Sequence, residues 1–199
     1  GVDFDWEHLS QYRDSDPDLH AQQRVVVGKV IVALKAALVE AGMEDMWICY
    51  TPRYNAFFPT TGSKYGQNNF ATDGEGADIF DYLETHSEFG VDAVDFVHLM
   101  MYDLDAQTAF VGAPEQYFVQ EHYDAVVQSH VDYGIPLEKV VMGFEPGPQA
   151  YTGVWGGIEH DEATIASMKD AAIGGVMFWA VNAPKVASNG KTVGETALA

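Results

Sequence analysis

Three carboxylates stand at alternate positions at the start of the chain. The first seven residues read GVDFDWE, with Asp3, Asp5 and Glu7 separated by Phe4 and Trp6. Residues two apart in a β-strand point to the same face. A strand here therefore places three carboxylates on one face. They repel one another there, and removing water from them costs free energy. We call Asp3, Asp5 and Glu7 the carboxylate ladder.

The spacing of the ladder leaves three interpretations open. Neighbouring carboxylates share protons, and one of their pKa values rises. The outermost group, Glu7, would then be protonated near neutral pH and act as a general acid toward a leaving-group oxygen. The same oxygens also suit a hard cation such as Ca²⁺. A solvated, ion-paired strand is the third interpretation.

Composition and charge restrict the class of protein. The 199 residues are 47% hydrophobic, enough for one sizeable core. The 30 acidic and 10 basic residues give a net charge of -20, which argues against nucleic acid and anionic membrane surfaces as partners. The single cysteine, Cys49, lies in the apolar run MWICY and is expected to be a buried thiol. No apolar run approaches the ~18 residues of a membrane span.

The order of predicted elements is alternating. Periodicity, caps and breakers predict strands at 1–6, 46–52, 93–103, 139–144 and 176–182, and helices at 19–41, 77–88, 114–133 and 161–172, the last capped by Asp161. The strands are near-continuous apolar runs, which is typical of parallel strands covered on both faces. A doubly wound sheet and a (β/α)8 barrel both fit this order. No glycine-rich phosphate loop follows a strand, which disfavours the nucleotide-binding sheet.

Three motifs in this order resemble those of the family 18 glycoside hydrolases, the chitinase family. GVDFDWE resembles the signature DxxDxDxE, whose first Asp would precede Gly1. MMYD at 100–103 resembles the family's M-x-Y-D after the sixth strand, and GGVMFW at 174–179 resembles G-G-x-M-x-W at the eighth. The resemblance implies an α/β fold, the (β/α)8 TIM barrel, of which this chain holds roughly strands four to eight. Residues 1–199 are then the C-terminal part of one catalytic barrel, without its first three βα units.

The resemblance also implies a reaction. Family 18 enzymes are retaining glycosidases, of chitinase or endo-N-acetylglucosaminidase type, in which the substrate's acetamido oxygen is the nucleophile. Glu7 would protonate the glycosidic oxygen and then activate water. Asp5 would hold the acetamido N–H, and Asp3 would share a proton with Asp5. Tyr102 would hydrogen-bond the acetamido group.

The remaining site residues are expected to bind the sugar. By the same resemblance Asp103 contacts the distorted sugar, and Trp179 forms an apolar floor under its ring. Met100 lies two residues before Tyr102, shares its face and is expected to line the cavity. The partner is thus a glycan containing N-acetylglucosamine, and no metal or cofactor is implied. The family's usual habit and the acidic composition indicate a secreted or extracellular protein.

Two alternative functions stay open. Glu145 follows the strand at 139–144, and Glu7 with Glu145 would form the pair of carboxylates, about 5 Å apart, of a two-carboxylate retaining glycosidase. Alternatively, the chain belongs to a chitinase-like lectin that binds N-acetylated glycans without cleaving them. Both Asp5 and Glu7 are present, which favours activity.

Three further expectations concern the rest of the chain. Five strands of a barrel leave open edges, so we expect residues 1–199 alone not to fold stably, and another segment or chain to complete the barrel. His98 shares the inward face with Met100 and is expected to be a structural histidine. The acidic residues Asp73, Glu75 and Asp78 are interpreted as solvated loop residues.

Overall fold

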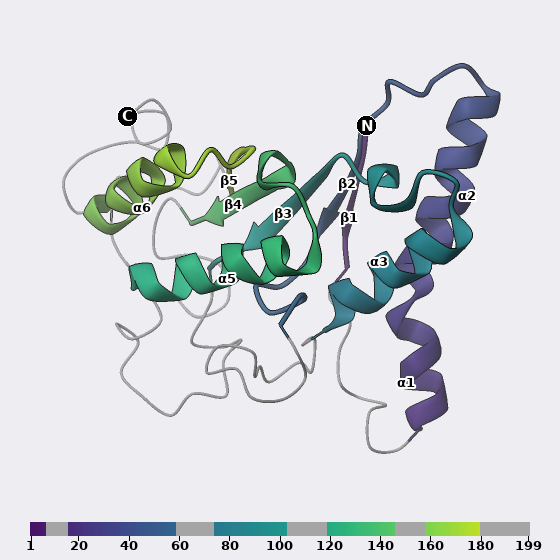
Figure 1. Cartoon of the computed structure of the whole chain (residues 1–199), viewed down its shortest axis with the longest axis horizontal. Coiled ribbons are helices and arrows are strands. Elements are labelled where there is room, and N and C mark those ends of the chain that lie inside the picture. The colour runs from purple at the N-terminus through teal and green to yellow at the C-terminus, as the bar shows by residue number, and fades with distance from the viewer. Residues whose placement is uncertain (7–15, 59–73, 103–118, 146–157, 180–199) are drawn as a thin grey trace.

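A computed structural model of the chain describes residues 1–6, 16–58, 74–102, 119–145 and 158–179 (Figure 1). Helices and strands alternate along these residues. In chain order the elements are β1 (Val2–Asp5), α1 (Pro17–Arg24), α2 (Val26–Glu40), β2 (Ile48–Thr51), α3 (Glu75–His86), the 3-10 turn η2 (Gly90–Ala93), β3 (Phe96–Met100), α5 (Gln120–Tyr133), the 3-10 turn η4 (Leu137–Lys139), β4 (Val140–Phe144), α6 (Ile158–Asp170) and β5 (Gly175–Phe178).

The strands form one parallel sheet in the order β1-β2-β3-β4-β5. Each strand pairs with the next strand of the sequence, and helices lie between them along the chain. A doubly wound sheet reverses its strand order at a switch point, and this sheet does not. Sequential parallel order is that of a (β/α)8 barrel, so the predicted fold class is confirmed as a partial barrel.

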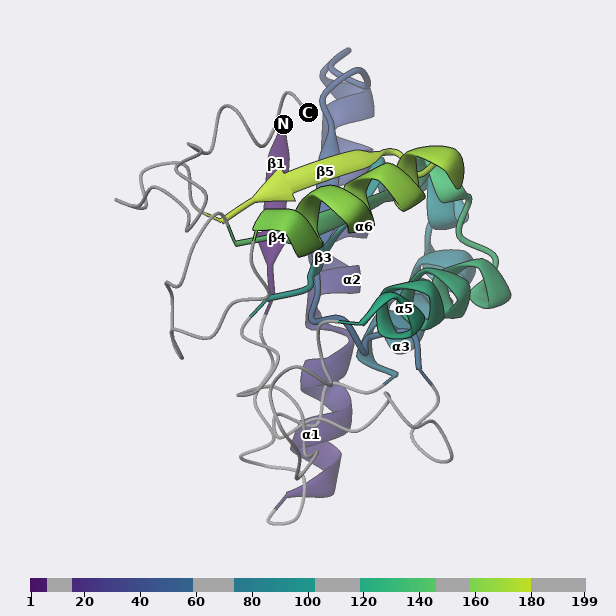
Figure 2. The ribbon, with the colours of Figure 1, turned by 90° about the vertical axis from the view of Figure 1, so that its left-hand side faces the viewer.

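The two faces of the sheet differ in character. One face packs against the helices and carries fully buried side chains such as Tyr50, Leu99 and Met142. We call it the helix-side face; Figure 2 shows α2, α3 and α5 together on that side. The other, the inner face, carries Asp3, Cys49 and Phe96 in register across β1, β2 and β3. The alternation of strand side chains produces this separation.

Strand β1 follows the predicted alternation. Phe4 and Trp6 pack against the helix-side core, while Asp3 points to the inner face. Val2 at the strand's start remains 40% exposed. Two apolar side chains thus hold β1 against the helices while its carboxylates face away from them.

Element boundaries depart from the predictions at two helices. The expected helix over 19–41 is two helices, because Val25 leaves the helical region with φ -108° and ψ 5°. The first of them starts at Pro17, where the Asp16 carboxylate accepts the Leu19 N–H at 2.9 Å. The helix expected from 161 starts at Ile158, so Asp161 lies inside α6 and does not cap it.

Two glycines shape the region around β4. Gly134 ends α5 in the left-handed conformation at φ 107°, which glycine adopts without strain. A Cβ at Gly143 on β4 would lie 2.3 Å from the Leu99 carbonyl oxygen and 2.7 Å from the Met177 methyl group. Only glycine fits there, so β3, β4 and β5 can approach one another. Within the described residues, no helix is both long and apolar enough to cross a membrane.

Candidate active site on the inner face

The candidate residues gather at one edge of the sheet. Asp5 ends β1, Tyr102 follows β3 by two residues, Glu145 follows β4 and Trp179 follows β5. All the strands are parallel, so these positions share the carboxyl edge. In barrel enzymes this edge holds the active site. Glu7 and Asp103 continue from the same strand ends but lie outside the described residues, so their positions stay predictions.

Asp3 has hydrogen-bond donors on both of its carboxylate oxygens. The Thr51 hydroxyl donates to Oδ1 at 2.7 Å, and Nδ1 of His98 lies 3.3 Å from Oδ2. Thr51 and His98 come from β2 and β3, so three neighbouring strands meet at this carboxylate. These hydrogen bonds link Asp3 of β1 to β2 and to β3.

The pKa values of this cluster reflect mutual stabilisation of charge. Partial burial alone would raise the pKa of Asp3, but hydrogen bonds from His98 and Thr51 and the charge on His98 hold it below its ordinary value. Burial alone would lower the pKa of His98, yet its hydrogen bonds to Asp3 and Cys49 raise that pKa to about 9. Asp3 is therefore a carboxylate and His98 an imidazolium at neutral pH.

The inner face near the other site residues is tightly packed. Met100 is 4% exposed and lies in register with Gly143, and the Tyr102 ring is 8% exposed. A Cβ placed on Gly143 would lie 3.2 Å from the Tyr102 ring, next to the Met177 methyl group. The glycine therefore makes room for Tyr102 and Met177. Met100 and Tyr102 thus both lie next to Gly143, and their lining of a sugar-binding cavity stays a prediction.

Trp179 and Glu145 lie in contrasting environments. The Trp179 side chain is 56% exposed, and its backbone N–H donates to the Phe144 carbonyl at 3.0 Å. The proposed stacking of this indole on a sugar ring stays a prediction. Glu145 is only 3% exposed and lies near Tyr123 of α5, whose pKa it helps to raise after burial and Asp161. Its proposed pairing with Glu7 stays a prediction.

Glu75 was interpreted wrongly from the sequence. It is 1% exposed at the start of α3, and its Oε1 accepts the indole N–H of Trp6 at 2.9 Å. Burial raises the pKa of Glu75 to about 8; the hydrogen bond from Trp6 and the charges of Arg24 and Arg53 act in the opposite direction, and Asp78 adds to the rise. Its position after a long polar loop suggested solvent exposure, and no local signal revealed that Trp6 needed a partner.

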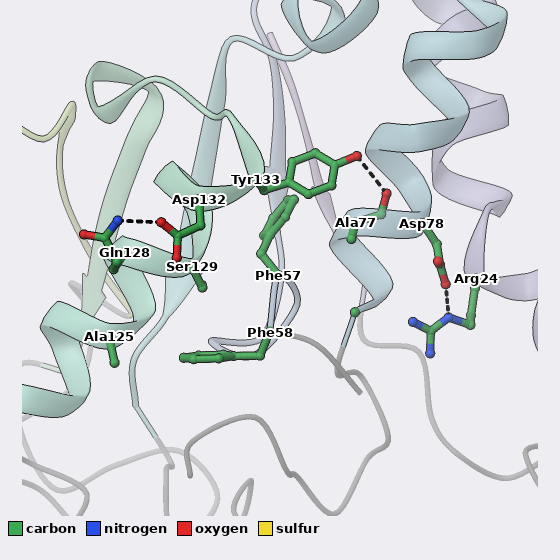
Figure 3. Close-up of a pocket in the computed structure, with 11 residues that line it drawn as sticks. Arg24, Phe57, Phe58, Ala77, Asp78, Ala125, Gln128, Ser129, Asp132 and Tyr133 are labelled. Carbon is green, nitrogen blue, oxygen red and sulfur yellow. Dashed lines mark hydrogen bonds and ion pairs between the residues drawn. The ribbon is translucent and has the colours of Figure 1, made fainter. Parts of the chain in front are cut away.

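A pocket lies on the helix side of the sheet, and Asp3 and Asp5 do not line it. A pocket of about 640 Å³ opens between α3, α5 and the turn after β2, and Phe57, Phe58 and Tyr133 contribute to its wall. Figure 3 shows Tyr133 donating to the Ala77 carbonyl and Arg24 paired with Asp78 at its rim. Tyr54, Phe57 and Phe58, in the turn after β2, are all buried core residues. We therefore place the candidate site at the carboxyl edge of the sheet and not in this pocket.

The described residues contain no cluster suited to a metal ion. No group of three or more His, Cys, Asp or Glu side chains converges there. Asp3 instead binds a hydroxyl and an imidazole, which are hydrogen donors. Cys49 is a buried free thiol, as predicted.

Fold and site together define an α/β protein built on part of a parallel barrel, with polar groups at the carboxyl edge. The solved structures that this chain resembles include glycoside hydrolases of family 18. The chain resembles a family 18 chitinase from Pseudoalteromonas aurantia with a TM-score of 0.56 and 17% identity, over 90% of this chain and 55% of that one.

Two further solved structures agree. The second catalytic domain of the group II chitinase of Ostrinia furnacalis matches with a TM-score of 0.53 and 14% identity, over 100% of this chain and 64% of that one. A mutant plant class V chitinase from Cycas revoluta, in complex with (GlcNAc)3, matches with a TM-score of 0.53 and 14% identity, over 90% of this chain and 62% of that one. Neither a family model nor a curated protein matches the sequence.

These comparisons confirm the family 18 resemblance at the level of the fold. The chain spans 55 to 64% of the three structures, so it corresponds to part of their length. At 14 to 17% identity the likeness concerns the arrangement of the chain.

Proposed function

We propose that the protein is a glycoside hydrolase that cleaves β-1,4-linked N-acetylglucosamine chains by substrate-assisted, retaining catalysis. The observation that carries this proposal is that Asp5 and Tyr102 both lie at the carboxyl edge of a parallel sheet whose fold matches that of family 18 structures. The solved chitinases of the same fold support the substrate class, and one of them was solved with (GlcNAc)3 bound. Because such polymers lie outside the cell, the proposal includes secretion.

The proposed chemistry divides the work between the strand ends. Glu7, two residues after Asp5 in the sequence, protonates the glycosidic oxygen and then takes a proton from the attacking water. The acetamido oxygen of the substrate attacks the anomeric carbon, and Asp5 accepts the acetamido N–H as positive charge develops. Tyr102 orients the acetamido group from β3. Each of these steps needs a fixed geometry, which the packed parallel strands provide.

The binding residues complete the site. The exposed indole of Trp179 offers an apolar face to the sugar ring. Met100 fills the inner face beside Tyr102, and Asp103 contacts the distorted sugar. Glu145, which is buried and follows β4, is proposed to be part of the sugar-binding site.

The experiment compares a Glu7→Gln variant with the parent on an N-acetylglucosamine tetramer. It uses the protein with all the segments that flank this chain, and it follows the products by mass. Loss of the general acid is expected to lower kcat/KM by at least about 10²-fold. Glu88→Gln, at an exposed glutamate between α3 and η2, serves as the matched control and keeps the parent rate.

The outcomes separate the alternatives. Cleavage by the parent and by the control, with loss in Glu7→Gln, supports the hydrolase. Binding of the tetramer without cleavage by any form contradicts the proposal and indicates a lectin. Equal rates for the parent and Glu7→Gln would remove Glu7 from its role.

A further inference from the structure

His98 and Asp3 form a pair that crosses the intervening strand. Nδ1 of His98 lies 3.3 Å from Oδ2 of Asp3, and the His98 side chain is 22% exposed. The other oxygen of Asp3 accepts the Thr51 hydroxyl at 2.7 Å. With a donor on each oxygen, Asp3 is satisfied as an acceptor. A proton on Asp3 would displace one of these donors.

The surroundings of His98 allow it to carry a positive charge. The titratable groups that face it in the described structure are Asp3 from β1 and Cys49 from β2. The neighbouring strand β4 contributes Val141 in register, which is apolar. Phe96, two residues earlier on β3, stacks at 6.4 Å between ring centroids. Asp3 is the one carboxylate among these groups, and its hydrogen bond and charge raise the pKa of His98 together with the contribution of Cys49.

We propose that His98 is a positioning residue for the carboxylate ladder and supplies, as an imidazolium, the positive charge that balances Asp3. The sequence resemblance implied that a proton shared between Asp3 and Asp5 does this. With His98 charged, Asp3 is ionised without a proton shared with Asp5. Asp5 keeps its proposed role of accepting the acetamido N–H. This inference rests on the proposed function for its catalytic part.

The pair has a consequence for the pH dependence of activity. An opposite charge in contact lowers a carboxyl pKa by about 1 to 3 units. Removing the cation therefore raises the pH at which Asp3 takes up a proton. The acid limb of the kcat/KM profile should move upward, whereas the rate at neutral pH should change little.

The first test needs no activity. Histidine-labelled protein, with its flanking segments, is titrated by NMR, and the His98 resonance is assigned with a His98→Gln variant. We expect His98 to titrate above pH 8 in the parent, and at least one unit lower in an Asp3→Asn variant. The titration curves of the other histidines, including exposed His86, should be the same in the two proteins. Titration of His98 near pH 6.5 in both proteins would overturn the proposal.

The second test measures kcat/KM for an N-acetylglucosamine tetramer against pH. In His98→Gln we expect the acid limb to move to higher pH by about one unit. At a fixed pH on that limb, kcat/KM should then be about tenfold lower than in the parent. His86→Gln, on the solvent side of α3, should reproduce the parent profile. The acid limb of the double variant Asp3→Asn/His98→Gln should lie at the same pH as that of Asp3→Asn alone, since the two residues act as one unit.

The two tests fail in different ways. A parent profile that His98→Gln leaves unchanged would remove the positioning role even if the ion pair exists. No hydrolysis by any form would overturn the proposed function and with it the catalytic role of His98. The titration would still report on the ion pair in that case, so the two failures are distinguishable.

Discussion

Two carboxyl groups lie on opposite faces of β1, one on the strand itself and one on α3, and their pKa values shift in opposite directions. Asp3 on the inner face receives a hydroxyl and an imidazole, and its pKa is lowered. Glu75 on the helix side receives the indole N–H of Trp6, and burial raises its pKa to about 8. One strand therefore separates a carboxylate held in its charged form from a carboxyl held in its neutral form.

The comparison shows what determines the charge of a carboxyl in this molecule. Glu75 has Arg24 and Arg53 in its surroundings, yet its removal from water outweighs their attraction. Asp3 remains 48% exposed and has a cation in contact, so desolvation is the weaker effect there. Asp3 is held in its charged form beside the proposed site, whereas Glu75 joins Trp6, the residue after β1, to the start of α3.

The largest expected difference between the faces is in activity. Asp5→Asn should lower kcat/KM on an N-acetylglucosamine tetramer by about 10²-fold or more, because it removes a group proposed to act on the substrate. Glu75→Gln should stay within a few-fold of the parent, because the amide oxygen still accepts the Trp6 N–H. Similar losses in both variants would break the distinction between the two faces.

Packing on the inner face gives the next largest effect. Gly143→Ala places a methyl group against the Leu99 carbonyl and Met177, and overpacking of this kind costs about 1 to 3 kcal/mol. Gly175→Ala on the adjacent strand is the matched control, because no atom lies within 4 Å of its added Cβ. Urea unfolding measures both, and equal free energies of unfolding for the two variants would contradict the described register.

The raised pKa of Glu75, on the helix side, should make the free energy of unfolding depend on pH. A carboxyl whose pKa rises on folding adds stability that is complete below its unfolded pKa, about 4.5, and is lost as pH rises through about 8. Between pH 5 and 9 the parent should therefore lose stability that Glu75→Gln keeps. One pKa unit corresponds to about 1.4 kcal/mol, so we expect a difference of at least about 1 kcal/mol in urea unfolding. Parallel pH curves would exclude the raised pKa.

The smallest effect concerns an ion pair that belongs to neither face. Lys139 lies 2.7 Å from Asp92, which is 76% exposed, and exposed pairs contribute about 0 to 1 kcal/mol. Asp92→Asn should therefore change the free energy of unfolding by less than about 1 kcal/mol. A larger loss would mean that exposure does not weaken charge pairing here, and would undermine the explanation for Asp3 and Glu75.

Much of the fold could be predicted from the sequence because its signals are local. Alternation in GVDFDW separated Asp3 from Phe4 and Trp6, and near-continuous apolar runs identified parallel strands. The choice between a doubly wound sheet and a barrel depended on strand order, which local patterns do not specify. The resemblance to family 18 motifs supplied that choice, and the sheet confirmed it.

The partners of the site residues could not be predicted, since they depend on contacts between distant segments. His98 lies 95 positions from Asp3 and Trp6 lies 69 from Glu75. Glu75 was interpreted as solvated because it follows a polar loop, and only the fold brings Trp6 to it. Asp161 was predicted as a helix cap, but α6 starts earlier and buries it.

The most direct test of the account is whether hydrolysis needs the N-acetyl group. The protein, with its flanking segments, is offered an N-acetylglucosamine tetramer and the fully deacetylated glucosamine tetramer under the same conditions. Substrate-assisted catalysis predicts cleavage of the acetylated tetramer alone, because the acetamido oxygen is the nucleophile. Comparable cleavage of the deacetylated tetramer would contradict the account and favour a nucleophile from the protein, with Glu145 the first candidate.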